Sequence, residues 1–176
     1  NADTFKLPFN LEIPGFHQSH YKLSLKFNRL FLTPYKADEL AVANLKGELF
    51  ASELGGEVKL DSNASAITLP KMLENDLLEL NQAKGSIKWQ KTDGAWSYEL
   101  NNMHLDNPDA SLDFDAAYSP QHGNRSEKIK IKGNIKRAKV AGITRYFPIA
   151  MSQDARKYIR QSLLDGQIND GSIHIE

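Results

Sequence analysis

Histidines and aspartates are the residues of this sequence whose types and spacing could support chemistry. His17 and His20 are close enough to share a metal ion, but the chain has no cysteine and no third ligand stands near this pair. A zinc site needs more ligands than these, so the spacing favours exposed loop histidines over a metal centre. Three further histidines are scattered along the chain: His104, His122 and His174. The sequence therefore predicts neither a metal site nor a cofactor.

An acidic stretch lies beyond the middle of the chain, at Asp106, Asp109, Asp113 and Asp115. It could attract calcium, yet it lacks the glycine and the terminal glutamate of an EF-hand loop. Asp113 and Asp115 also alternate with apolar residues, which predicts a solvated sheet face more simply. No serine stands in a nucleophile-elbow context, and no glycine-rich phosphate loop is present. The sequence does not predict an enzyme.

Composition narrows the class of protein. The chain has 176 residues, 40% hydrophobic and 25% charged, which is ordinary for one globular domain. Basic and acidic residues both number 22, so no net charge exists to gather nucleic acid. No apolar run is long enough to span a bilayer, and no basic-then-apolar leader opens the chain. Asn1 and Ala2, with an alternating run that stops at Glu176, suggest a segment excised from a longer protein.

Apolar and polar residues alternate along most of the sequence, which is typical of strands with one wet face. The pattern is clearest from Leu112 to Ile135, where a turn-rich break separates two alternating runs. Similar runs surround Leu25, Leu45 and Val58. Four dipeptides with permissive backbones separate such runs and predict antiparallel connections: Gly55-Gly56, Asp93-Gly94, Asn107-Pro108 and Asp170-Gly171.

The Asp93-Gly94 turn also predicts a register, because a two-residue loop fixes which residues of its two strands face each other. The predicted pairs are Trp89 with Tyr98, Ile87 with Leu100, and Lys88 with Glu99. The first two pairs lie on the apolar side and the third on the polar side. A longer loop would instead place Trp89 opposite Trp96.

A helix is predicted in the C-terminal third. After Ser152 the apolar residues repeat every four positions, at Ala155, Ile159 and Leu163. Ser152 is a suitable N-cap, Asp154 lies in the first turn, and Gly166 follows as the stop. A shorter helical turn is predicted around 138–143, and the pattern over 70–80 fits either a short helix or an irregular strand.

Basic residues gather in one corner of the sequence. Lysines alternate with apolar residues from Lys128 to Lys136, and Lys139 and Arg145 extend this basic character. The corner could contact phosphate head groups or another anionic partner. For the lysine row, an outer face kept soluble by charge is the simpler interpretation. Lys139 and Arg145 are the candidates for an anionic-partner surface.

Short motifs follow one another in a fixed order along the chain. They are Gly47 to Leu49, Gly55 to Ser62, Leu69-Pro70, Gly85 to Trp89, Trp96 to Tyr98, and Leu105 to Ala110. The C-terminal third adds Ala138 to Val140, Arg145 to Pro148, Leu163 to Ile168, and Gly171 to Ile173. The order and spacing of these motifs, over roughly residues 40–176, resemble the YhdP-type members of the AsmA-like family.

This resemblance implies a large envelope protein of Gram-negative bacteria. Members are anchored in the inner membrane by an N-terminal helix and carry a long periplasmic β-structure whose sheet encloses a hydrophobic groove. They are implicated in moving phospholipid toward the outer membrane. The chain would then be one periplasmic segment of such a bridge, with phospholipid, the parent protein's anchor and an envelope protein as partners. The family supplies no catalytic residues.

Pattern and resemblance together predict a mainly β fold with a minor α part, a curved antiparallel meander with one amphipathic helix near the C-terminus. We expect a single segment over 1–176: strands over 1–136, a helical insertion over 137–166 and a truncated hairpin over 167–176.

The apolar face of such a sheet would carry acyl chains, with the helix after Ser152 closing or bracing one side. The residues predicted to line it are Ile87, Trp89, Tyr98, Leu100, Leu112, Phe114, Tyr118, Ile129 and Ile131. The alternative is an ordinary packed core, which would make the chain a non-enzymatic scaffold or protein-interaction module.

Overall fold

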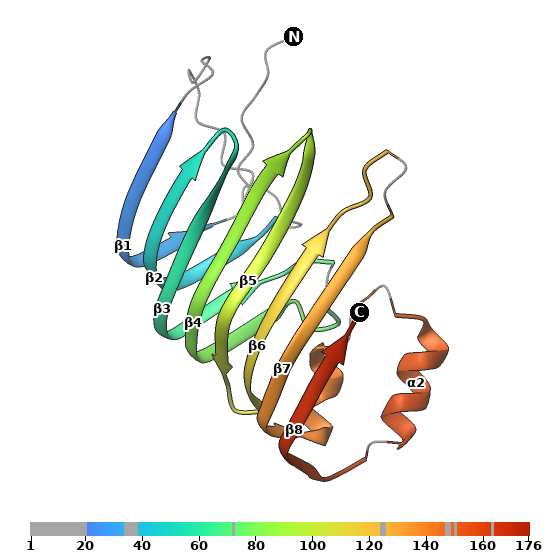
Figure 1. Cartoon of the computed structure of the whole chain (residues 1–176). Coiled ribbons are helices and arrows are strands. Elements are labelled where there is room, and N and C mark those ends of the chain that lie inside the picture. The colour runs from blue at the N-terminus through green and yellow to red at the C-terminus, as the bar shows by residue number, and fades with distance from the viewer. Residues whose placement is uncertain are drawn as a thin grey trace.

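The computed structural model describes residues 21–33, 39–71, 73–123, 126–146, 149, 151–162 and 164–176. These residues form one sheet of eight antiparallel strands in sequence order, so each strand pairs with its neighbours along the chain (Figure 1). The predicted mainly β fold is confirmed. The pair His17 and His20 lies outside the described residues.

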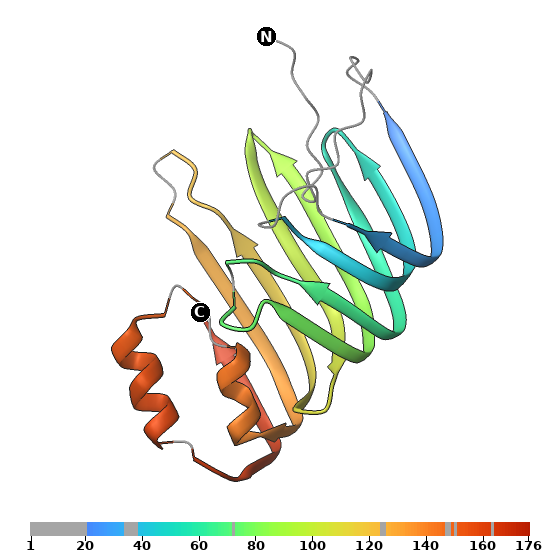
Figure 2. The same ribbon diagram turned by 180° about the vertical axis from the view of Figure 1, so that it is seen from behind.

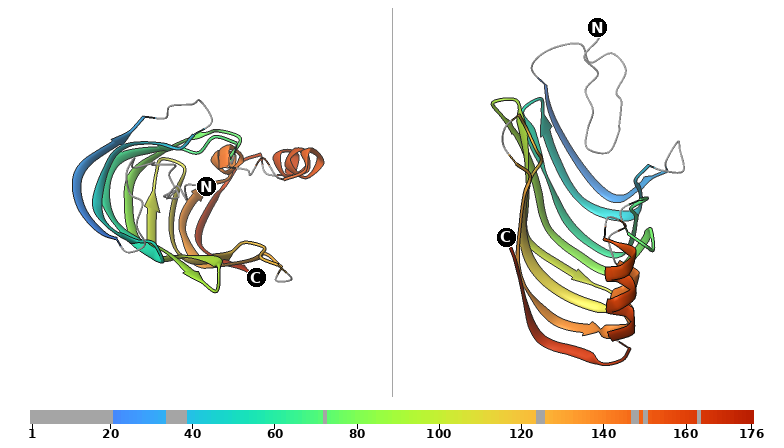
Figure 3. Two further views of the ribbon diagram at one scale, coloured as in Figure 1. Left: turned by 90° about the horizontal axis from the view of Figure 1, so that it is seen from above. Right: turned by 90° about the vertical axis from the view of Figure 1, so that its right-hand side faces the viewer.

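The eight strands are long, and the helices form a small part. The strands are β1 (Lys22–Leu32), β2 (Ala41–Ser52), β3 (Gly55–Thr68), β4 (Leu77–Thr92), β5 (Ala95–Asp106), β6 (Ala110–Ser119), β7 (Lys128–Lys139) and β8 (Gln167–Ile175). Between β7 and β8 lie α1 (Val140–Ile143), the 3-10 helix η1 (Thr144–Tyr146) and α2 (Gln153–Ser162). Seen from above, the sheet is an open arc with the helices at one end of it (Figure 3).

The ends of the strands form two rims. At the hairpin rim, tight turns join β2 to β3 and β4 to β5, and residues 120–127 join β6 to β7. At the loop rim, residues 69–76 join β3 to β4, residues 107–109 join β5 to β6, and the helices join β7 to β8. Figure 2 shows the β3–β4 connection and both helices on the same side of the sheet.

One row of residues crosses the sheet where the strands bend, and we call it the corner row. Its members are Phe27, Gly47, Leu60, Gly85, Met103, Phe114, Gly133 and Ile173. A Cβ atom on Gly47 would lie 2.1 Å from Lys59 O, and one on Gly133 would lie 2.5 Å from Phe114 Cβ. Because no side chain fits at these glycines, their large neighbours can fill the inside of the bend.

Residues with a left-handed backbone lie close to the corner row. They are Asn44 (φ 58°), Ala64 (φ 52°), Asn102 (φ 51°) and Asp170 (φ 55°). The ladder between β2 and β3 shifts register between Ala43 and Gly47, and the ladder between β5 and β6 shifts between Leu100 and Met103. Such bulges bend a strand and increase its twist, which explains the curvature of the sheet.

Polar side chains satisfy the backbone groups that these bulges release. Ser62 Oγ accepts a hydrogen bond from Lys46 N at 2.7 Å and donates one to Lys46 O at 3.0 Å. Asn44 Nδ2 donates to the carbonyl oxygen of Ala64 at 2.9 Å. Asp115 Oδ1 accepts a hydrogen bond from Asn102 N at 2.7 Å. The bend is therefore built without leaving these backbone groups unpaired.

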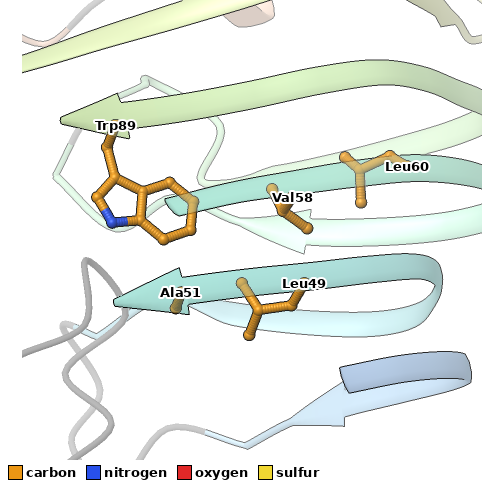
Figure 4. Packing of buried hydrophobic residues seen from close by; sticks show 5 residues of the cluster. All are labelled: Leu49, Ala51, Val58, Leu60 and Trp89. Atoms are coloured by element: carbon orange, nitrogen blue, oxygen red, sulfur yellow. The ribbon is translucent and has the colours of Figure 1, made fainter. Parts of the chain in front are cut away.

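Apolar side chains gather on one face of the sheet, on the inside of the arc. Figure 4 shows the buried cluster of this face, which comprises Leu49, Ala51, Val58, Leu60 and Trp89 from β2, β3 and β4. The indole of Trp89 lies over Gly56, where a Cβ atom would come within 2.4 Å of the ring. The glycine thus provides the space in which the indole lies flat on the neighbouring strand.

The register predicted from the Asp93-Gly94 turn is confirmed. β4 pairs with β5 through Trp89 and Tyr98, Ile87 and Leu100, and Lys88 and Glu99, and Trp96 lies opposite Lys91 instead. Asn107-Pro108 joins β5 to β6 as predicted. Around Pro70 the chain is an irregular connection that leads into β4 at Leu77, so the helical alternative does not hold there.

Two glycine-containing turns were predicted wrongly. Asp170-Gly171 lies inside β8, which runs as one strand from Gln167 to Ile175, so the predicted terminal hairpin is absent. Asp170 uses its positive φ within the strand rather than in a turn. At Gly55-Gly56, the two-residue turn comes earlier, because Ser52 already pairs with Gly55.

The helical predictions hold with adjusted ends. α1 confirms the short turn near Ala138, and β7 continues to Lys139, past its predicted end. α2 begins after Ser152, whose Oγ accepts a hydrogen bond from Ala155 N at 3.2 Å, so the predicted N-cap is confirmed. α2 ends at Ser162, and Gly166 (φ 127°) lies further on, where its carbonyl accepts a hydrogen bond from Val140 N.

The left-handed backbone of Ala64 leads to a first prediction. An alanine in this conformation is strained by roughly 1–2 kcal/mol relative to glycine. Ala64→Gly should therefore raise the free energy of unfolding by about 1 kcal/mol in urea denaturation. Ala66→Gly, two residues further along the same strand and without positive φ, should lower it instead. Equal effects of the two substitutions would contradict the role of Ala64 in the bend.

Candidate functional site

The inner face of the arc is apolar across the whole sheet, and we call it the trough. Besides the corner row, it contains an aliphatic row with one residue from each strand. Strand pairing places side by side Leu25, Leu49, Val58, Ile87, Leu100, Ala116, Ile131 and Ile175. Because side chains alternate between faces, these residues share one face with the corner row.

A third row of the trough lies nearer the hairpin rim and carries aromatic side chains. This rim row comprises Leu23, Ala51, Gly56, Trp89, Tyr98, Tyr118 and Ile129. The rings of Tyr98 and Tyr118 stack with their centroids 6.1 Å apart. Tyr118 Oη donates a hydrogen bond to Glu127 Oε1 at 2.7 Å, and this bond raises the pKa of the tyrosine.

All nine residues predicted to line the apolar face lie on this one face. Ile87, Leu100 and Ile131 belong to the aliphatic row, and Phe114 belongs to the corner row. The rim row contains Trp89, Tyr98, Tyr118 and Ile129. Leu112 lies beyond the corner row, between Leu105 and Ile135. Trp89 is 5% exposed and Ile129 is 48% exposed, so the trough is closed over at one place and open at another. Whether these residues contact lipid stays a prediction.

The outer face of the sheet is charged. Lys26 pairs with Glu48 at 3.1 Å, and Glu57 lies 3.8 Å from Lys88. Asp113 on β6 lies between charged partners on the two neighbouring strands: its carboxylate oxygens are 2.6 Å from His104 Nδ1 on β5 and 2.6 Å from Lys136 Nζ on β7. The hydrogen bond from Lys136, followed by that from His104, lowers the pKa of Asp113.

The acidic stretch is divided among separate partners. Asp106 pairs with Arg137 at 3.4 Å, and Asp109 pairs with Arg145 at 3.1 Å. Asp113 and Asp115 have the partners described above. Among the residues that the structure describes, no three histidine, aspartate or glutamate side chains are grouped so as to hold a metal ion.

A buried polar network fastens η1 to the loop rim. Asp109, which is 8% exposed, accepts hydrogen bonds from Arg145 Nη1 at 3.1 Å and from Tyr146 Oη at 3.0 Å. Asn107 Nδ2 donates to the same Tyr146 Oη at 2.8 Å. Burial, and then the hydrogen bond to Asp109, raises the pKa of Tyr146. Sequence reasoning missed this network because its partners are more than thirty positions apart.

The two residues predicted as an anionic-partner surface differ in their surroundings. Arg145 is engaged by the Asp109 carboxylate. Lys139 is exposed, and its backbone N–H donates to Asp109 O at 2.7 Å. The two side chains thus flank the polar network, and the guanidinium of Arg145 already has an anionic partner within the chain.

Helix α2 is tethered to the loop rim by ion pairs. Glu74, in the β3–β4 connection, accepts hydrogen bonds from Arg156 Nη1 at 3.4 Å and from Arg160 Nη2. These arginines are one helical turn apart, so one carboxylate can reach both. The helix lies beside the end of the arc and does not form a second layer over the trough (Figure 3). Of the two predicted roles, closing or bracing one side, this position agrees with bracing and not with closing.

A comparison with protein-family models identifies the family of this chain. A family model described as YhdP protein matches residues 6–176, almost the whole chain. The chain belongs to the YhdP family. Membership fits a lipid-transport protein of the Gram-negative envelope and agrees with the motifs that run from Gly47 to Ile173.

Two other comparisons found no relatives for this YhdP-family chain: no curated protein matches it, and neither does any solved structure. Within the described residues, no helix is both long and apolar enough to cross a membrane. The family is not known for enzymes.

The tether of α2 gives a second prediction. Glu74→Gln removes the charge that holds Arg156 and Arg160, so we expect faster amide hydrogen exchange across α2 with unchanged exchange in β4. The exposed Glu79, on β4, has no ion-pair partner among the described residues and provides the matched control Glu79→Gln. Unchanged exchange in α2 would mean that apolar contacts, rather than Glu74, hold the helix.

The depressed pKa of Asp113 gives a third prediction. A carboxylate with a lowered pKa in the folded state stabilises the protein above its unfolded pKa, near 3.9, and this contribution disappears as pH falls through the folded pKa. Asp113→Asn should therefore lower the free energy of unfolding at pH 7. In urea denaturation near pH 3, the difference from the wild type should shrink. A difference that stays constant with pH would argue against the charged contacts with Lys136 and His104.

Proposed function

We propose that this chain is a periplasmic segment of a phospholipid-transport bridge, in which the trough holds acyl chains. The observation that carries the proposal is the aliphatic row, which crosses all eight strands from Leu25 to Ile175 without one polar side chain. Family membership supports the same function, because it fits a lipid-transport protein.

The exposure of the trough supports lipid contact over a wholly packed core. Ile129 is 48% exposed and Ile175 is 45% exposed, although both lie on the apolar face. Tyr118 on the same face is 36% exposed. Contiguous apolar surface of this kind marks a binding surface in soluble proteins. Each methylene of an acyl chain that it covers would contribute about 0.8 kcal/mol.

The chemistry of the trough favours a ligand that can slide. A site for one specific ligand combines an apolar pocket with a few convergent polar groups. The aliphatic row contributes only leucine, valine, isoleucine and alanine side chains, so neighbouring positions offer an acyl chain similar contacts. Such a surface holds hydrocarbon without fixing its position, which suits transport along the sheet.

Leu100 allows a test in the middle of the trough. It lies between Ile87 and Ala116 and is half-buried, so Leu100→Glu places a carboxylate where acyl chains are proposed to lie. We expect phospholipid that co-purifies with the chain, measured by mass spectrometry, to fall at least tenfold, while far-ultraviolet circular dichroism keeps its β signal.

Asn101→Glu is the matched control. Asn101 is the next residue of β5, is also half-buried and faces the opposite side of the sheet, so its glutamate should leave bound lipid unchanged. If Leu100→Glu unfolds the chain, Leu100 belongs to a packed core. If the folded wild type carries no phospholipid, the chain is a scaffold module and the proposal fails.

A further inference from the structure

The inner face of the sheet meets an ammonium group one step beyond the rim row. The corner row, the aliphatic row and the rim row contain no charged residue. Further toward the hairpin rim, Lys91 pairs with Trp96 across β4 and β5. These two residues lie two positions beyond the rim-row pair Trp89 and Tyr98, and therefore share its inner face. The ammonium group of Lys91 lies over the indole of Trp96, 5.7 Å from its centroid.

A carboxylate lies at the same end of the inner face, beside β6. Glu127 precedes Ile129 of the rim row by two positions, and its Oε1 accepts a hydrogen bond from Tyr118 Oη at 2.7 Å. Lys128 instead pairs with Ser119, one residue out of phase with the pair of Tyr118 and Ile129, so it faces the outer side. The inner face thus ends in one ammonium group and one carboxylate, and we call this part, with Lys91 and Glu127, the charged edge.

Neither charge of the charged edge is neutralised by the part of the chain that the structure describes. There, Lys91 has an indole as its partner and no carboxylate, and Glu127 has a phenol and no cation. Both side chains are exposed. On the outer face, by contrast, Glu57 lies 3.6 Å from Lys59 and 3.8 Å from Lys88. The two opposite charges of the charged edge are therefore available to a ligand.

The spacing of these charges suits a single zwitterionic group. The backbones of β4 and β7 are three strand spacings apart, and each spacing is about 4.8 Å. Lys91 reaches one strand inward to the ring of Trp96 on β5, and Glu127 reaches one strand inward to Tyr118 on β6. About one spacing then remains between the two charges. The stacked rings of Tyr98 and Tyr118 bridge the same two strands with their centroids 6.1 Å apart. A phosphoethanolamine group separates its phosphate from its ammonium on this scale.

The charged edge adjoins aromatic and exposed apolar surface of the trough. Tryptophan and tyrosine favour positions where hydrocarbon meets water, because each ring has an apolar body and a polar end. Trp96, Tyr98 and Tyr118 form such a boundary beside the two charges. Ile129, two positions from Glu127, is 48% exposed. A lipid whose acyl chains cover Ile129 would therefore bring its head group to the charged edge.

We propose that the charged edge selects phospholipids whose head group ends in a primary ammonium group, with Lys91 on the phosphate oxygens and Glu127 on the ammonium. The inference rests on the proposed function and adds a ligand class to it. An ammonium group can donate charge-assisted hydrogen bonds to the Glu127 carboxylate. The head group of an anionic lipid offers no cation there, so its net negative charge is repelled by the carboxylate.

Calorimetric titration with three short-chain lipids tests this selectivity. Dihexanoyl phosphatidylethanolamine, dihexanoyl phosphatidylglycerol and dihexanoylglycerol share their acyl chains and differ in the head group. We expect the wild type to bind the ethanolamine lipid about tenfold more tightly than the phosphatidylglycerol, as for one charge-assisted hydrogen bond. Glu127→Gln should abolish this preference and leave binding of dihexanoylglycerol unchanged. The glutamine keeps an oxygen that can accept the hydrogen bond from Tyr118.

Two further variants test the two charges separately. Lys91→Gln should weaken both phospholipids about tenfold and leave dihexanoylglycerol unchanged, because both phospholipids carry the phosphate. Glu127→Lys should reverse the preference, so that the phosphatidylglycerol binds more tightly than the ethanolamine lipid. Circular dichroism checks that each variant keeps its sheet. A preference for the ethanolamine lipid that survives Glu127→Gln or Glu127→Lys would overturn the inference.

Glu99→Gln is the matched control, because Glu99 follows Tyr98 on β5, is exposed and faces the outer side. It should leave all three affinities unchanged. If Glu99→Gln abolishes the preference and Glu127→Gln does not, the head group lies on the outer face and the inference is overturned.

Free phosphoethanolamine separates a lipid site from a site for the head group alone. We expect it to bind at least about tenfold more weakly than the ethanolamine lipid, because it gains no apolar contacts in the trough. Equal affinity would overturn the lipid assignment. Equal binding of both phospholipids to the wild type would overturn the selectivity. If the wild type binds none of the three lipids, the proposed function itself fails, which distinguishes that outcome from failure of the charged edge.

Discussion

Crowding at the inside of the bend is the constraint on which the rest of this structure depends. Eight long strands with one apolar face would form an open sheet, and burying that face requires the sheet to curve. At the corner row, three glycines remove side chains where the backbone of the next strand comes closest, as at Gly47 beside Lys59 O. The large side chains of Phe27, Leu60 and Phe114 then occupy the space. The alternation of glycines and large residues in the corner row therefore determines both the curvature of the sheet and the packing inside the bend.

The bend also explains the positions of several polar residues, which the alternating pattern alone would assign to the solvent-exposed face. Ser62 is completely buried and satisfies both backbone groups of Lys46, and Asn44 and Asp115 serve the bulges in the same way. An unpaired buried backbone group destabilises a protein by roughly 1–3 kcal/mol, so each of these side chains offsets the disruption that curvature introduces. A strand can depart from ideal pairing only where such a partner is available.

The sequence predicted those features of the fold that depend on residues close together along the chain. The Asp93-Gly94 loop fixed the pairing of Trp89 with Tyr98 because its two residues leave one register. Asp170-Gly171 carries the same signal, a preference for positive φ, but that preference serves a strand interior equally well. The partners of Arg145 and Glu74 lie 36 and more than 80 positions away along the chain, so no local pattern could reveal that these charges neutralise one another.

Lipid transport would need apolar contacts along the path and charged groups at its edges, and the trough supplies the former while the two rims supply the latter. Neighbouring strands lie about 4.8 Å apart, so an acyl chain that moves by one strand exchanges one aliphatic contact for another of similar size. Such movement needs no specific polar group inside, and the aliphatic row has none. Orientation must then come from the rims, where the charges differ. The arginines of the loop rim pair with Asp106, Asp109 and Glu74, and the pairs with Asp109 and Glu74 hold η1 and α2 in place. At the hairpin rim, Lys91 lies over the ring of Trp96, 5.7 Å from its centroid, so the two rims differ in the partners of their cations.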